Sequence, residues 1–407
     1  MVHVQRVLFV LGLSALVACS SAEDQESKDG PGSGEVTASN PFGLTPAQCA
    51  ASPAPAVFGN GLCVCGDFND IGNLVVDGAG DGNLGSVGVN GTTKIINNAK
   101  VAGSWASGKG FSGIGNVNVG LSMYTPGDLS VAGNMEIGKN LHVGGKMSGF
   151  GRLAVKGELG VRGANSVIGY QQIAAEGTYQ DAPEAPCGCS GKGYLDVGAA
   201  IDRAKSKNDN GAKDVPSSLG AVGVAVLTLE TGSYYFGGSV QSIGFQRIRV
   251  KGAVSMYIDG SLEQIGAEVF DLADGSTLDL YVRGTVRTIG HFRLGDAKNP
   301  AALRLFIAGG EEISLAIGNQ IFHGAIYAPK ASLKYVGNTI VEGALFANEL
   351  TGIGNLEIRA ARPTPPTGCP GAPGSGGTTG EKTPTPSSGG DAPEQPRSDG
   401  VGTPVIR

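Results

Sequence analysis

Residues 105–159 read WASGKG FSGIGN VNVGLS MYTPGD LSVAGN MEIGKN LHVGGK MSGFGR LAVKGE L when they are written in blocks of six. The first position of each block is apolar or aromatic, the third is mostly β-branched, and the fifth is mostly Gly. Side chains two positions apart point to the same side of a strand, and Gly suits the corner that follows. Such a short repeat is typical of a β-solenoid, in which three blocks make a coil of about 18 residues. We therefore expect an all-β parallel β-helix (β-solenoid).

A second set of repeats, with a longer period, lies between Val222 and Ile358. Residues 255–260 (SMYIDG), 279–284 (DLYVRG) and 304–309 (RLFIAG) align with one another. These strands are apolar on both sides, which is typical of parallel sheets that are covered on both faces. If their aliphatic side chains fill the interior, the aromatic ones form an outward stripe of Tyr257, Tyr281 and Phe306.

A short helix is predicted over residues 196–207. Asp196 can cap its start, and the apolar residues Val197, Ala200, Ile201 and Ala204 then follow at helical spacing. An aromatic stripe needs a cover, and this amphipathic helix can supply it. We therefore expect the helix to pack on the side of the solenoid, with Tyr257, Tyr281 and Phe306 as its docking stripe.

The first residues of the chain read as an export signal. Arg6 precedes a short apolar run, and Leu16-Val17-Ala18-Cys19 resembles the bacterial lipobox. The resemblance implies a signal peptide over residues 1–18, cleavage before Cys19 and lipidation of this cysteine, so that a lipid anchor attaches the protein to a membrane. The expected location is the bacterial cell envelope, as an outer-membrane lipoprotein that faces the periplasm or the cell surface.

Six further cysteines are disulfide candidates in an exported protein. The even number favours disulfides over a metal site, because Cys-x-Cys is not the usual zinc spacing. We favour bridges between the pairs Cys63/Cys65 and Cys187/Cys189, which would tie the start of the solenoid to a later excursion and lock its ends. The six candidates are Cys49, Cys63, Cys65, Cys187, Cys189 and Cys369.

Composition divides the rest of the chain. The predicted segments are a lipidated tether at 19–40, a first β-helix section at 41–193, a helical excursion at 194–217, a second β-helix section at 218–360 and a disordered tail rich in Pro, Gly, Ser and Thr at 361–407. The net charge of −6 among 407 residues argues against a nucleic-acid partner.

The search for catalytic chemistry gives no candidate residues. The acidic residues Asp259, Asp271, Asp274 and Asp279 lie near one another, but the alignment places Asp259 opposite Arg283, which favours an ion pair. The histidines 142, 291 and 323 fall on unrelated repeat positions. We therefore expect no enzyme activity, no cofactor and no metal.

Several segments resemble known surface families. Gly66-Asp67-Phe68-Asn69 resembles the opening of choice-of-anchor A domains, and residues 322–331 (FHGAIYAPKA) resemble a β-helix module of pilus-associated surface proteins. The six-residue blocks resemble those of bactofilins. These resemblances imply a structural, scaffold or adhesive envelope protein, whose partners include the membrane and either further copies or envelope polysaccharide and protein. The alternatives are a β-helix that binds or degrades polysaccharide, and an accessory protein of a pilus or secretion system.

Overall fold

The structure is a computed structural model that describes residues 57–78, 84–181, 185–191, 194–311, 313–317 and 320–361. In these residues the chain forms a parallel β-solenoid of about 13 turns with one short helix on its side, as the repeats predict. The predicted signal peptide, Cys19 with its tether, Cys49, Cys369 and the tail from 362 onward lie outside the described residues.

The first section of the solenoid follows the six-residue blocks. Neighbouring coils pair in parallel with Trp105 opposite Met123 and Phe111 opposite Leu129, so three blocks make one coil. The residues at the first position are buried from Trp105 to Leu159, which confirms the predicted interior. The strands are β1 (Leu62–Val64), β2 (Phe68–Gly78), β3 (Val87–Val89), β4 (Thr92–Ile96), β5 (Ala99–Val101), β6 (Trp105–Ser107), β7 (Gly110–Val119), β8 (Met123–Thr125), β9 (Leu129–Ile137), β10 (Leu141–Val143), β11 (Met147–Val161) and β12 (Asn165–Glu176).

The second section has the same parallel pairing, with longer coils except near β22, where Leu333 lies opposite Leu350. Its aliphatic residues point inward, as Met256 and Ile258 do, while the aromatic residues between them point outward. The strands are β13 (Gly220–Gly237), β14 (Val240–Asp259), β15 (Leu262–Leu272), β16 (Thr277–Val282), β17 (Val286–Arg293), β18 (Leu303–Ile307), β19 (Ile313–Ile317), β20 (Gln320–His323), β21 (Ala325–Glu342) and β22 (Leu345–Ala360), with a 3-10 turn η2 at Pro300–Ala302.

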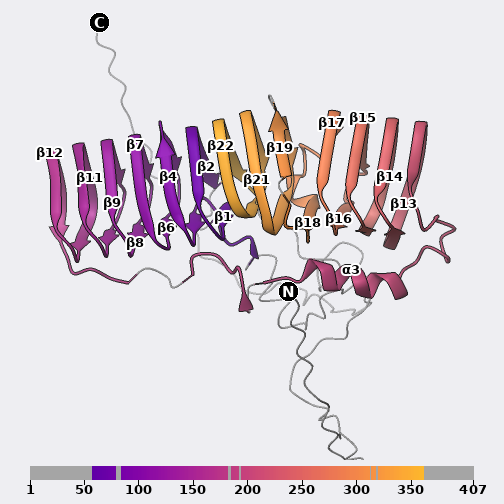
Figure 1. Cartoon of the computed structure of the whole chain (residues 1–407), viewed down its shortest axis with the longest axis horizontal. Coiled ribbons are helices and arrows are strands. Elements are labelled where there is room, and N and C mark those ends of the chain that lie inside the picture. The colour runs from indigo at the N-terminus through magenta and orange to yellow at the C-terminus, as the bar shows by residue number, and fades with distance from the viewer. Residues whose placement is uncertain are drawn as a thin grey trace, which may run out of the picture. The chain divides into compact units, whose positions relative to one another are not determined.

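The two sections form one continuous stack whose spatial order differs from the chain order. The stack begins with β13, proceeds coil by coil to β22, continues at β1 and β2, and ends with β12 (Figure 1). The last strand of the chain therefore pairs with the first strands, and the described ends of the chain meet in the middle of the stack. We call this junction the seam. It is a topology that the repeats alone do not specify.

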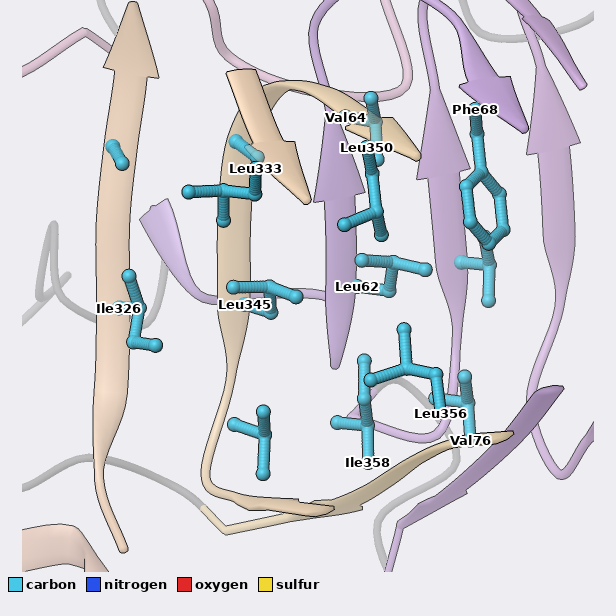
Figure 2. Packing of buried hydrophobic residues seen from close by; sticks show 14 of the residues in the cluster. Leu62, Val64, Phe68, Val76, Ile326, Leu333, Leu345, Leu350, Leu356 and Ile358 are labelled. Atoms are coloured by element: carbon cyan, nitrogen blue, oxygen red, sulfur yellow. The ribbon is translucent and has the colours of Figure 1, made fainter. Parts of the chain in front are cut away.

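The interior is continuous across the seam. Leu62 of β1 lies opposite Leu345 of β22, and Phe68 of β2 lies opposite Leu350. Figure 2 shows these side chains from both sections filling one lumen, and they belong to one buried apolar cluster. Each coil advances by about 4.8 Å, the spacing of hydrogen-bonded strands.

The connection between the sections runs back along the outside of the stack (Figure 1). After β12 the chain leaves the sheet, and helix α3 (Val197–Ser206) precedes β13. The first section therefore ends its strands at Glu176 rather than at the predicted residue 193. We call residues 177–196 the strap, although residues 182–184 and 192–193 within it are not described.

Candidate functional site

The outward aromatic side chains of the second section form the predicted stripe. The rings of Tyr257 and Tyr281 stack with centroids 4.5 Å apart at an angle of 8°, and those of Tyr281 and Phe306 at 4.7 Å and 10°. The rings stack because the coils pair residue to residue, Tyr257 opposite Tyr281 and Tyr281 opposite Phe306. The stripe continues through Tyr327 and Phe346, whose ring centroids lie 4.8 Å apart.

Helix α3 covers this stripe. Asp196 caps the helix by accepting a hydrogen bond of 3.0 Å from the backbone N–H of Ala199. The apolar face of the helix and the stripe form one buried cluster. Burial also raises the pKa of Tyr281 well above its ordinary value. The stripe is therefore a docking face for the chain's own helix, as predicted, and it is closed to a ligand. The helix residues in the cluster are Val197, Ala200, Ile201 and Ala204.

An ion-pair network fixes the helix to the solenoid. Arg283 contacts both Asp259 on the neighbouring coil and Asp202 on α3. The hydroxyl of Tyr235 donates a hydrogen bond of 2.6 Å to Oδ2 of Asp259. Burial acts to raise the pKa of Asp259, but the hydrogen bonds from Tyr235 and Arg283 hold it below its ordinary value. Asp259 is thus engaged in structure, in agreement with the predicted ion pair.

Two disulfides fasten the strap to the first coil. Cys63 bonds to Cys187 and Cys65 to Cys189, which confirms the favoured pairing of the two Cys-x-Cys motifs. The side chain of Asn90 accepts a hydrogen bond of 2.8 Å from the N–H of Cys187 and donates one of 3.0 Å to its carbonyl. The bridges lie at the seam, however, so the expectation that they lock the ends of the solenoid is wrong. It failed because β1 is in the middle of the stack.

The other polar residues that the sequence singles out are dispersed. Asp279 is buried in an ion pair with Arg304, whereas Asp271 and Asp274 are exposed. In the part of the chain that the structure describes, no group of three or more His, Cys, Asp or Glu side chains is arranged to hold a metal ion. The same part contains no helix that is both long and apolar enough to cross a membrane.

Two histidines have structural partners. His142 is buried, stacks on Tyr124 with centroids 5.2 Å apart, and accepts a hydrogen bond from the N–H of Gln180 in the strap. Nδ1 of His323 lies 2.6 Å from Oε2 of Glu342 on the next coil. These contacts hold the strap and the coils together, and the side chain of His291 lies outside the described atoms.

One corner of the solenoid carries a row of exposed apolar side chains, which we call the corner ladder. Neighbouring coils pair several of these residues directly, for example Ile353 with Ile71 across the seam and Ile96 with Ile114, and Ala132 takes this position between Ile114 and Phe150. Each is about half exposed or more, from 45% for Ile96 to 75% for Ile168. The described members are Ile243, Ile265, Val336, Ile353, Ile71, Ile96, Ile114, Phe150 and Ile168.

A row of asparagine side chains runs beside the corner ladder. The side-chain amide of each asparagine donates a hydrogen bond to the side-chain oxygen of the asparagine on the preceding coil. The distance is 2.6 Å from Asn355 to Asn338 and 2.7 Å from Asn73 to Asn355. The row therefore crosses the seam without a break. It continues through Asn98, Asn116 and Asn134.

Residues 191–360 match a family model described as a domain of unknown function (DUF7305). This span begins just before α3 and ends with β22, so it contains the helix, the stripe and the whole second section. The boundary of the match at residue 360 coincides with the seam. No curated protein and no solved structure matches the chain.

Sequence reasoning missed both the corner ladder and the seam. A signal for the ladder is present, because the triplet Ile-Gly-Asn recurs at 71–73, 114–116 and 353–355. The glycine of each triplet has a positive φ, which is +117° at Gly115 and +130° at Gly354, so it makes the corner. The buried hydrogen bond between Asp70 and Tyr335, which also crosses the seam, had no comparable signal because these residues are 265 positions apart.

Proposed function

We propose that this protein is a lipid-anchored structural component of the bacterial cell envelope, with a scaffold or adhesive role. The observation that carries this proposal is the position of β1 and β22, which pair with each other in the middle of the stack. A lipid on Cys19, followed by residues 20–56, would then hold the solenoid at its seam. Both terminal coils would be left free to make contacts.

The surface chemistry supports a structural role. The described coils direct their side chains mainly at one another, through the filled lumen, the covered stripe and the asparagine row. What they leave exposed is repeated from coil to coil, as the corner ladder shows. A repeated surface suits an extended partner that is contacted at many equivalent points. The two disulfides also agree with an oxidising compartment outside the cytoplasm.

Metabolic labelling tests the anchor. Cells that express the full chain are grown with labelled palmitate, and the protein is isolated and fractionated between membrane and soluble pools. The full chain should carry label and stay with the membrane, whereas Cys19→Ser should lose both properties. Ser21→Ala is the matched control and should behave as the unchanged chain. An unlabelled chain that fractionates as a soluble protein would contradict the proposed anchor.

Polymer binding separates the structural role from the polysaccharide-degrading alternative. The chain is incubated with isolated envelope polysaccharide, which is then pelleted, and the length of the polymer is measured over time. A scaffold or adhesin that uses polysaccharide should pellet with the polymer and leave its length unchanged. Shortening of the polymer would instead identify a degrading enzyme, and failure to pellet would direct the search to protein partners.

A further inference from the structure

The two ends of the stack finish in open strand edges. Among the described residues β12 pairs with β11, and its other edge has no strand beside it. In the same way β13 pairs with β14 and has an open edge along residues 220–230. Open edges expose unpaired backbone N–H and C=O groups, and soluble proteins usually protect them with charged residues or with a cover.

That protection is sparse on both edges, because each edge has one glutamate at its end, Glu176 on β12 and Glu230 on β13. Residues 165–175 and residues 220–229 contain no charged side chain, whereas the adjoining coils carry Arg152 and Lys156 at one end and Arg249 and Lys251 at the other. Large apolar side chains are also strongly exposed there. They are Ile168 at 75% and Tyr170 at 63% on β12, and Val224 at 80% and Val226 at 56% on β13.

On the third side of the coil, both ends carry a further segment of the chain. At the β12 end the chain leaves the stack after Gly177, and the N–H of Gln180 bonds to His142 on the outer surface. Residues 175–178 run beside residues 158–160 there, with Glu176 opposite Leu159 and the N–H of Gly177 bonded to the carbonyl of Leu159, so this side of the last coil is partly covered. At the β13 end, residues 209–217 lie beside residues 233–237, through the hydrogen bonds Asp209 N to Ser233 O and Gly237 N to Ser217 O.

The seam shows how two such ends join. There the last coil of the second section stacks on the first coil of the first section, with β2 and β22 paired over Phe68–Gly78 and Leu350–Ala360. Glycines meet at the corner, Gly354 opposite Gly72. The same corner glycine is present at each open end, as Gly169 in β12 and Gly223 in β13. Both open edges also have the same strand direction, because they belong to one parallel stack.

We propose that copies of this chain associate head to tail, with the β13 edge of one copy adding to the β12 edge of the next in parallel register. Gly223 then lies opposite Gly169, and the two strands meet along residues 220–229 and 166–175. The same register places Glu230 opposite Glu176 at the end of the contact, where their repulsion weakens it. The contact joins two different surfaces, so it does not close on itself and produces linear filaments. This association goes beyond the proposed anchoring and does not depend on the lipid.

Sedimentation velocity and negative-stain electron microscopy test this assembly on the full chain carrying Cys19→Ser, which removes the lipidation site. The chain should form linear particles whose mass rises with concentration. Ile168→Lys on β12 and Val224→Lys on β13 should each give monomers, because each places a charge on one open edge. A mixture of these two variants should give dimers only, since each variant keeps one intact and complementary end.

Ile114→Lys is the matched control for Ile168→Lys, because it changes the same corner position in the middle of the stack at an exposure of 54%. It should assemble as the unchanged chain does. A chain that stays monomeric at its highest soluble concentration would overturn the proposal. Loss of assembly in Ile114→Lys that equals the loss in Ile168→Lys would also overturn it, because association would then use the corner ladder. Circular dichroism and thermal unfolding of each variant establish that it is folded.

Discussion

The hydroxyl of Tyr335 donates a hydrogen bond of 2.5 Å to Oδ1 of Asp70, and this bond joins the two solenoid sections inside the lumen. Gly352 lies between them in the stack, opposite Tyr335 on one side and Asp70 on the other. A Cβ at Gly352 would lie 1.8 Å from the Tyr335 ring, so the missing side chain is the space that the ring occupies. Oδ2 of Asp70 is buried with no hydrogen-bond partner among the described residues.

Because the carboxyl group of Asp70 is buried, we expect the free energy of unfolding to fall as the pH rises. Burial raises the pKa of Asp70 from 3.8 to about 6, although the Tyr335 hydrogen bond acts to lower it. The folded protein therefore holds this proton more tightly than the unfolded chain, and the stabilisation is lost between pH 3.8 and about pH 6. The loss is about 3 kcal/mol. Urea unfolding at several pH values measures this loss. Across this window the free energy of unfolding of the unchanged chain should fall relative to that of Asp70→Asn.

Tyr335→Phe provides the control for this prediction. It removes the donor and leaves the carboxyl group of Asp70 buried without a partner, so the free energy of unfolding should fall by about 1–3 kcal/mol. The loss should be larger above pH 6 than below it. If Asp70→Asn has the same pH dependence as the unchanged chain, another group is responsible.

The six-residue blocks predict the coil because each coil repeats one local pattern. Trp105, Phe111 and Val117 occupy one coil, and a side chain that points inward at one of these positions fixes its neighbours by strand alternation. The order of the coils has no such local determinant. Leu345 lies opposite Leu62 because both edges present aliphatic residues in the same register. The order of the repeats along the chain does not reveal this pairing.

The stripe and the disulfides were predictable for a related reason. Tyr257, Tyr281 and Phe306 are spaced by one coil each, so their stacking follows from the repeat, and the matching Cys-x-Cys spacings bring both cysteine pairs into register. The open ends were not predictable, because whether β12 or β13 is terminal depends on where the strap turns back. Only three-dimensional information places Ile168 and Val224 on edges.

The two disulfides should act as nearly redundant clamps on the strap. Each closes a loop with a sequence separation of 124 residues, and closing such a loop contributes about 5 kcal/mol in the chain-entropy model. Removing Cys63–Cys187 by the double change to Ala should cost only about 1–2 kcal/mol, since the other bridge keeps the loop closed. Removing both bridges should cost about 5 kcal/mol. Urea unfolding of the single-bridge and bridge-free chains measures this, and equal costs for one and two bridges would contradict it.

A single charged substitution on helix α3 should detach the helix from the stripe. Ile201 is fully buried against the stripe, so Ile201→Asp places a charge in an apolar cluster and should undock the helix at a cost of at least about 3 kcal/mol. The exposed aromatic rings should then bind the dye ANS, while the far-ultraviolet circular dichroism of the strands is retained. Ser206→Asp, on the exposed side of the same helix, is the control. Dye binding that is equal in both variants would show that the stripe is accessible without undocking.

At the solenoid corner, replacing the asparagine with Ala should lower the free energy of unfolding less than replacing the glycine with Ala. Gly133 has a φ of +135°, and a Cβ there would lie 2.1 Å from the carbonyl oxygen of Gly115 on the preceding coil. Gly133→Ala must therefore separate two coils or change the backbone, at about 2–4 kcal/mol. Asn134→Ala breaks one rung of an exposed row, where water can replace the lost amide, and should cost no more than about 1 kcal/mol. Thermal and urea unfolding of the two variants give the comparison, and a larger loss for Asn134→Ala would mean that the side-chain row, rather than the glycine corner, holds the coils in register.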